Sequence, residues 1–189
     1  MKFHNIIPVI CLSFFMVAAH PYESAAMLVG PIMFDEHKNV QDTHLKLNGA
    51  GLKKFINFKV VAVGFYLPQG TPARNSLTNI PKHLEVVYLL NVPKAELDHE
   101  TERGIESNVN EAEFIKLRSR INQMNSYYQD VRKGDRIGVS YLPDVGTIVS
   151  FNGQVQGIVK GADFAQAFFS IWVGDNPVDK LMKRRLLGV

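Results

Sequence analysis

The chain has 189 residues, of which 46% are hydrophobic and 21% are charged, and its formal net charge is +3. These values are typical of one globular domain with its own hydrophobic core, and they exclude an intrinsically disordered chain. The excess of cations is small and forms no long run, so neither nucleic acid nor an anionic membrane surface is an expected partner.

The N-terminal segment, residues 1–19, resembles a secretory signal peptide. Lys2 and His4 precede an apolar run from Ile6 to Ala19, which is too short to span a membrane as a helix and ends in small residues suited to cleavage. An uncleaved membrane anchor and a later cleavage site, near residues 25–26, are the alternatives. We expect residues 20–189 to form one exported domain without a transmembrane span, periplasmic if the source is Gram-negative.

The only cysteine of the chain, Cys11, lies inside this predicted leader. The mature protein would then contain no cysteine, and it would rely on its core rather than on disulfides. Thiolate metal sites and cysteine nucleophiles are excluded for the same reason.

The predicted centre of the fold is the stretch from Asn48 to Leu67. From Phe58 onward both alternating faces are mostly apolar, which predicts a central strand covered on both sides. A strand over residues 41–47 is expected to lead into a turn at Asn-Gly-Ala-Gly, residues 48–51. Lys53 and Lys59 lie an even number of residues apart, so one unbulged strand would point both to the same face, and one of them could face a ligand.

The remaining strands are predicted from alternating apolar residues and from turn signals. Residues 27–34 contain Gly30-Pro31 and fit an edge strand or an irregular lead-in. Asn152-Gly153 is a strong two-residue hairpin signal, because both turn positions need positive φ. We expect further strands at residues 84–90, 136–141, 147–151 and 154–159.

Helices are predicted in the second half of the chain. Asn110 and Glu113 fit a capping box before a helix whose apolar stripe includes Phe114. Asp163 is expected to cap the next helix, and Asn176 the last one. These helices are expected to end at the glycines at positions 174 and 188.

Residues 93–108 are acidic and polar, so any helix there is expected on the surface. Their cluster of His99, Glu100, Glu102 and Glu106 suggests either a solvated helix face or a metal site. The solvated face is favoured, because one histidine among flexible carboxylates makes a poor transition-metal site. Across the whole chain the pattern predicts an α+β fold with mostly antiparallel strands.

Motifs for cofactor chemistry are missing from the sequence. Gly49-Ala50-Gly51 lacks a third glycine, Lys53 is not in a phosphate-loop setting, and no serine lies in a nucleophile-elbow pattern. The six histidines include no pair at metal-ligand spacing. We therefore expect no cofactor and no metal.

Four stretches resemble the chalcone isomerase family, in particular its bacterial exported chalcone isomerase-like branch. They are Asn48-Gly-Ala-Gly-Leu-Lys53 leading to Phe58–Leu67, Tyr141-Leu-Pro-Asp-Val-Gly-Thr147, Gly161-Ala-Asp-Phe164, and Ile171-Trp-Val-Gly-Asp-Asn-Pro-Val-Asp179. The resemblance implies an open-faced β-sandwich, in which a long antiparallel sheet is covered by a helical layer, with a ligand cleft between them. Enzymes of the family close a chalcone into a flavanone without a cofactor, and other members bind fatty acids.

The resemblance also implies which residues lie in the cleft. An arginine that meets the substrate or a carboxylate in the family falls on Lys53, which keeps the charge and loses the two-pronged donor geometry. A threonine or tyrosine of the central strand falls on Val61, which lacks the hydroxyl. A catalytic donor of this kind is worth about 3 to 4 kcal/mol, so its loss weakens the expectation of isomerase activity.

The leading hypothesis is an exported, non-catalytic protein that binds a fatty acid or similar apolar anion. Lys53 would meet the head group, and the tail would lie on Val61, Phe65, Phe114, Phe168 and Trp172. The alternatives are a cofactor-independent isomerase, an intramolecular lyase using Lys53 as electrostatic stabiliser, and a structural or partner-binding domain.

Overall fold

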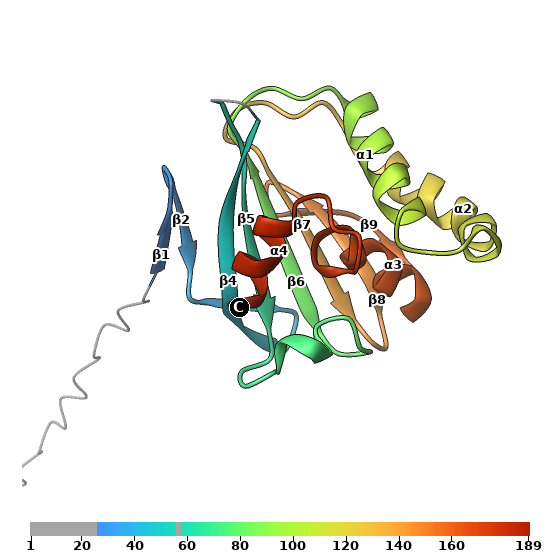
Figure 1. The fold of residues 1–189 in the computed structure, drawn as a ribbon, viewed down its shortest axis with the longest axis horizontal. Helices are drawn as coiled ribbons and strands as arrows, with labels where there is room; N and C mark the ends of the chain where they lie inside the picture. The colour runs from blue at the N-terminus through green and yellow to red at the C-terminus, as the bar shows by residue number, and fades with distance from the viewer. Residues whose placement is uncertain (1–25, 56–57) are drawn as a thin grey trace, which may run out of the picture.

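The fold is built on a seven-stranded, fully antiparallel sheet with helices on one face (Figure 1). The computed structural model describes residues 26–55 and 58–189. The strand order follows the sequence, so each strand pairs with the next along the chain. The strands are β3 (His37–Val40), β4 (Thr43–Phe55), β5 (Phe58–Leu67), β6 (Lys82–Tyr88), β7 (Arg136–Leu142), β8 (Gly146–Phe151) and β9 (Gln154–Val159).

Within the described part of the chain, four α-helices lie on the sheet or beside it. Helices α1 (Lys94–Glu106) and α2 (Glu111–Ser126) are inserted between β6 and β7, and α3 (Ala162–Val173) and α4 (Lys180–Leu187) follow β9. A short 3-10 turn, η1 (Ala73–Asn75), lies in the loop after β5. None of the helices in the described part of the chain has the length and hydrophobicity needed to cross a membrane.

The central strand β5 confirms the prediction from the apolar pattern, because all residues from Val61 to Leu67 are buried. Val61, Val63 and Phe65 belong to the large core under the helices. Ala62 belongs to a smaller cluster on the opposite face, where the hairpin of β1 (Ala26–Val29) and β2 (Ile32–Asp35) packs. The predicted lead-in over residues 27–34 is therefore a separate two-stranded hairpin.

The predicted turn at residues 48–51 is wrong, because β4 runs without a break from Thr43 to Phe55. Its glycines serve close packing against α4. A Cβ atom at Gly49 would collide with the carbonyl oxygen of Arg185, and one at Gly51 would lie 2.6 Å from Sδ of Met182. The side-chain amide of Asn48 also donates to the carbonyl oxygen of Leu186 at 2.6 Å.

The chain reverses between β4 and β5, so Lys53 and Lys59 lie on different strands. Lys53 is paired with Val61, and Lys54 is paired with Lys59 after a register shift. The prediction that both lysines share one strand is therefore wrong. The side chain of Lys59 lies outside the described residues, as do the predicted leader at residues 1–19 and Cys11.

The predicted helix boundaries are partly right. Asn110 and Glu113 form the predicted capping box of α2, and Gly174 and Gly188 are the C-caps of α3 and α4. The predicted N-caps of the last two helices are wrong. Gly161 precedes α3, and Asp163 inside its first turn pairs with Arg120 at 2.6 and 2.7 Å.

Helix α4 begins after Asp179, whose side chain accepts a hydrogen bond from the backbone of Met182 at 2.8 Å. Asn176 was the predicted cap, but its side-chain amide donates to the carbonyl oxygen of Ser107 instead. That bond holds the segment before α4 against the end of α1, so the side chain of Asn176 serves a tertiary contact rather than a cap.

Candidate functional site

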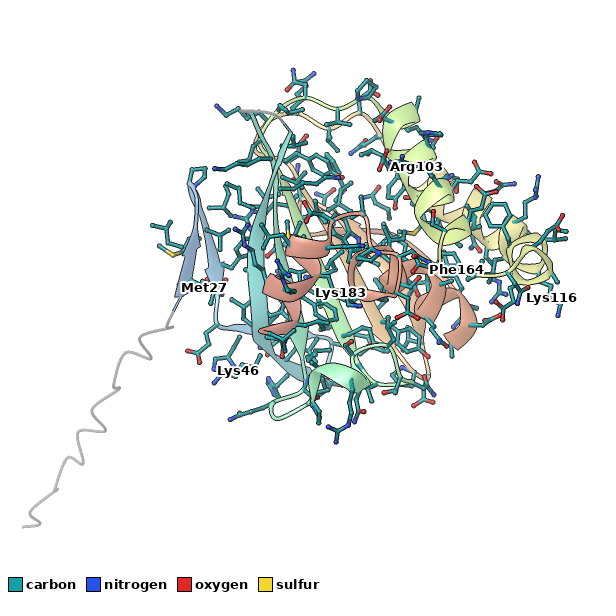
Figure 2. All side chains as sticks on the ribbon, viewed as in Figure 1. Met27, Lys46, Arg103, Lys116, Phe164 and Lys183 are labelled. Atoms are coloured by element: carbon teal, nitrogen blue, oxygen red, sulfur yellow. The ribbon has the colours of Figure 1, made fainter. Side chains whose placement is uncertain are left out.

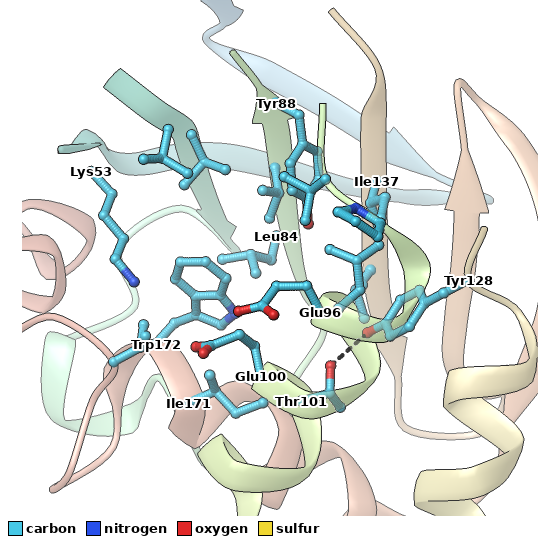
Figure 3. A pocket seen from close by; sticks show the side chains of 18 of the residues that line it. Lys53, Leu84, Tyr88, Glu96, Glu100, Thr101, Tyr128, Ile137, Ile171 and Trp172 are labelled. Atoms are coloured by element: carbon cyan, nitrogen blue, oxygen red, sulfur yellow. Dashed lines mark hydrogen bonds between the residues drawn. The ribbon is translucent and has the colours of Figure 1, made fainter. Parts of the chain in front are cut away.

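A cavity of about 660 Å³ lies between the helix-covered face of the sheet and helices α1 and α3. Its floor comes from β5, β6 and β7, and Lys53 of β4 lies at its edge (Figure 3). Helix α1 and the loop before it close one side, and α3 closes another. The lining residues are Lys53, Val60, Val61, Leu84, Val86, Tyr88, Ile137, Val139, residues 90–93, Glu96, Leu97, Glu100, Thr101, Arg103, Tyr128, Phe168, Ile171, Trp172 and Val178.

Three adjacent strands place a row of residues across the floor near the end of the sheet. Val61 is opposite Lys53 on β4 and opposite Tyr88 on β6, so all three residues project to the same face. Because neighbouring strands lie about 4.8 Å apart, the Lys53 and Tyr88 backbones are separated by roughly 10 Å. The row therefore places an ammonium group and a phenol on either side of a small apolar side chain.

Beyond this row the floor is apolar. Val86 pairs with Ile137, and Leu84 pairs with Val139, and all four side chains line the cavity. Phe168 and Ile171 from α3 add to the apolar wall. The cavity thus has a polar end at the row of Lys53 and Tyr88 and an apolar end further along the strands.

Three hydroxyl groups, those of Tyr88, Thr101 and Tyr128, are among the polar groups that line the cavity. The hydroxyls of Thr101 and Tyr128 are hydrogen-bonded to each other at 3.1 Å. Burial, and secondarily the neighbouring Tyr128, raise the pKa of Tyr88. Burial also raises the pKa of Tyr128, against the lowering effect of its bond to Thr101. Both phenols are therefore neutral hydrogen-bond donors at physiological pH.

Charged side chains surround the mouth of the cavity. Glu96 and Glu100, one turn apart on α1, extend their carboxylates toward the indole of Trp172, and Lys53 extends toward the same ring (Figure 3). Arg103 pairs with Glu100 at 2.5 Å, and this hydrogen bond raises the pKa of the arginine. Figure 2 labels Arg103 on α1, where its largely exposed side chain lies at the edge of the cavity.

The cavity brings together four of the six predicted site residues, which are Lys53, Val61, Phe168 and Trp172. Phe65 and Phe114 do not line it. Phe65 is fully buried in the solid core, where its ring centroid lies 6.1 Å from that of Phe169. Phe114 lies on α2, with the guanidinium of Arg118 over its ring at 5.6 Å. The apolar stripe of this helix predicts that Phe114 is buried, but it does not show whether the side chain packs in the core or lines a cavity.

Sequence reasoning missed the polar residues of the cavity. Tyr88 was assigned only to a strand, and Glu100 was interpreted as part of a solvated helix face. The spacing of Leu97, Thr101 and Ile105, each four residues apart and all buried, was the available signal that α1 turns one side inward. Among the described residues no group of three potential metal ligands is found.

A second hollow, of about 490 Å³, lies at the other end of the sheet beside Lys82. Lys82 is 1% exposed, and its ammonium donates to the carbonyl oxygen of Thr78 at 2.6 Å. The ammonium also lies 5.4 and 5.6 Å from the ring centroids of Tyr141 and Phe169. Burial lowers the pKa of Lys82 to about 8. The bond to Thr78 gives this lysine a structural role, holding the loop after η1.

Comparison with known proteins supports the fold. A family model described as chalcone isomerase-like matches residues 26–188. Among solved structures, the crystal structure of a fatty-acid binding protein from Arabidopsis thaliana is similar, with a TM-score of 0.69 and 15% sequence identity over 86% of this chain and 96% of that chain. No curated protein matches the sequence. The predicted α+β open-faced β-sandwich is confirmed.

Proposed function

The chain belongs to the chalcone isomerase-like family, and we propose that it acts as a non-catalytic binding protein for a fatty acid or a similar apolar anion. The observation that carries the proposal is the cavity of about 660 Å³, which is apolar along the strands and has a cation at one end. Its volume lies within the range of roughly 300 to 1,000 Å³ typical of small-molecule sites. The similar fold of a plant fatty-acid binding protein supports the same ligand class.

The row of Lys53, Val61 and Tyr88 orients the ligand. An anionic head group between Lys53 and Tyr88 would accept a charge-assisted hydrogen bond from the ammonium and one from the phenol. The tail would then lie over Val86 and Leu84, toward Phe168. Burying the tail against these side chains supplies most of the affinity, since each buried CH₂ group contributes about 0.8 kcal/mol.

The test is a titration with dodecanoate and hexadecanoate, followed by the fluorescence of Trp172, the single tryptophan of the chain. Lys53→Met keeps the length of the stem and removes the charge. Losing a hydrogen bond to a charged group costs about 1.5 to 3 kcal/mol, so affinity should fall by roughly ten- to a hundredfold. Lys54→Met is the matched control. Lys54 is exposed and does not line the cavity, so this substitution removes the same charge without changing the binding site.

Thermal unfolding gives an independent readout of the same binding. A ligand at a hundred times its Kd stabilises the folded state by about 2.7 kcal/mol, and the melting temperature should rise accordingly. No shift with either acid, together with no acyl lipid in an extract of the natively purified protein, would reject the proposal and leave the structural or partner-binding role.

A cofactor-independent isomerase is the second candidate, and the hydroxyl groups of Tyr88, Thr101 and Tyr128 favour it. A phenol and a bonded threonine–tyrosine pair inside a cavity with Lys53 can donate to a ketone on which negative charge develops. Loss of chalcone absorbance above the spontaneous rate, reduced in both Lys53→Met and Tyr88→Phe, would support this activity. If chalcone absorbance fell only at the spontaneous rate even with excess protein, isomerase activity would be rejected.

We also propose that the protein functions outside the cytoplasm, after removal of residues 1–19. The support is the sequence alone, in the basic start and the apolar run ending at Ala19. N-terminal sequencing of the protein from its native host tests this directly. A mature chain beginning at Met1 would contradict it.

A further inference from the structure

The mouth of the cavity carries balanced charge. Lys53 and Arg103 contribute two cations, and Glu96 and Glu100 contribute two carboxylates. Arg103 is committed to Glu100, and no ion-pair partner of Glu96 lies within 4 Å among the residues that the structure describes. A simple anion bound at Lys53 would therefore sit close to Glu96, a carboxylate that has no direct ion pair among the described residues.

Trp172 provides the second part of the argument. Its indole lies between the Lys53 side chain on one side and the Glu96 and Glu100 carboxylates on the other (Figure 3). An aromatic face next to carboxylates is the arrangement that recognises alkylammonium groups, because the ring quadrupole and the carboxylates both attract a cation. The half-buried position of Trp172 on α3 lowers the local dielectric and strengthens this attraction.

Tyr88 provides an independent sign of a polar ligand group. Tyr88 is half-buried and lines the cavity, and within the described residues its hydroxyl has no hydrogen-bond partner. This hydroxyl is not among the fully buried polar atoms, so it faces the cavity and can donate to a ligand or to water there. The register places Tyr88 two strands away from Lys53 on the same face of the sheet, so an anionic group that lies between them has a donor on either side.

From these observations we propose that the ligand head group is zwitterionic, with an anionic part between Lys53 and Tyr88 and an ammonium part held by Glu96, Glu100 and Trp172. The inference rests on the proposed function, because it assigns the head group of the same apolar-chain ligand. A zwitterion leaves the mouth neutral, whereas a fatty acid leaves a net negative charge there.

The experiment compares probes with one dodecyl chain and different head groups, each below its micelle concentration and at low ionic strength. The probes are dodecanoate, dodecyltrimethylammonium, dodecylphosphocholine and the carboxybetaine N-dodecyl-N,N-dimethylglycine. Affinities are read from Trp172 fluorescence and from calorimetry. We expect at least one zwitterion to bind about tenfold tighter than either singly charged probe. A preference for phosphocholine over the betaine would identify phosphate as the anionic part.

The variant Glu96→Gln/Glu100→Gln removes the proposed ammonium site and keeps the shape of both side chains. It should weaken the zwitterion about tenfold and strengthen dodecanoate, so the order of preference reverses. The matched control is Glu102→Gln/Glu106→Gln, which makes the same charge change on the exposed side of α1, outside the cavity lining. This control should leave the zwitterion preference intact.

The outcomes separate this inference from the function on which it rests. If dodecanoate binds tightest and the Glu96/Glu100 variant changes nothing beyond its control, the zwitterion inference is wrong and the fatty-acid proposal stands. If none of the probes binds, both are wrong. Tightest binding of dodecyltrimethylammonium would also overturn the inference, because the mouth would then bind a head group that is only cationic.

Discussion

The contact between α1 and α3 sets the width of the cavity mouth, and Gly104 controls it. Gly104 lies one turn after Glu100 on α1, and it faces Ile171, the residue before Trp172 on α3. A Cβ atom at this glycine would lie 2.8 Å from Cγ2 and 2.9 Å from Cγ1 of Ile171. Gly104→Ala therefore tests whether the two helices are held at this distance.

Two effects of opposite sign determine how Gly104→Ala changes the free energy of unfolding. Replacing a helical glycine by alanine favours the helix by about 1 kcal/mol. The new methyl group would be about 0.7 Å too close for carbon atoms, whose optimal separation begins near 3.5 Å. Overpacking of this kind costs about 1 to 3 kcal/mol. We expect a net loss of up to about 2 kcal/mol in the free energy of unfolding, and weaker dodecanoate binding because the mouth widens.

Denaturant unfolding of a double-mutant cycle isolates the contact. Ile171→Ala alone should cost about 2 to 5 kcal/mol, because Ile171 is 5% exposed. In the Gly104→Ala background the same change also relieves the collision, so its cost should fall by about 1 to 2 kcal/mol. The proposed collision between Gly104→Ala and Ile171 would be refuted if the unfolding free-energy changes of the two single variants were additive and Gly104→Ala alone stabilised the protein by about 1 kcal/mol.

Two further predictions concern parts of the fold away from the cavity. The folded pKa of Lys82, about 8, is below its ordinary value of 10.5, so unfolded chains bind more protons between these pH values and stability should rise with pH there. The gain, up to about 3 kcal/mol, should be missing in Lys82→Met when both proteins are unfolded by urea across this range. Gly49→Ala should cost more than about 2 kcal/mol because its methyl group meets the Arg185 backbone, which cannot rotate away. Asn48→Ala, which only loses the bond to Leu186, should cost about 1 kcal/mol, and an equal melting temperature for the two variants would contradict this assignment.

The elements that could be predicted from sequence are those specified by neighbouring residues. Strand β5 is predicted by apolar residues on both of its faces. The Asn152-Gly153 turn is predicted by residues that tolerate positive φ, and the structure has positive φ at both positions. The start of α2 is predicted by its capping box. The glycines at 49 and 51 were misread as a turn because their purpose is contact with α4. Contacts with α4, such as the bond between Asn48 and Leu186 across 138 positions, leave no local signal in the sequence.

The candidate site was predictable only where family resemblance or amphipathic spacing pointed to it. Lys53 and Val61 came from the resemblance, and Phe168 and Trp172 from the apolar face of α3. The same reasoning chose Phe65, because an apolar side chain looks alike in a sequence whether it faces solid packing or an open cavity. Tyr88 was missed because its value depends on the register with Val61, which no single strand reveals.

The docking of α4 on β4 has a consequence for how this protein is made. Helix α4 covers the long strand β4. At Gly49 and Gly51 the strand has no side chains, so only α4 can cover this part of its surface. The contact between Asn48 and Leu186 joins residues 138 positions apart, so it can form only after the segment that contains α4 has been synthesised. The face of β4 beneath α4 therefore stays uncovered while the rest of the sheet pairs, and this part of the native packing forms late in folding.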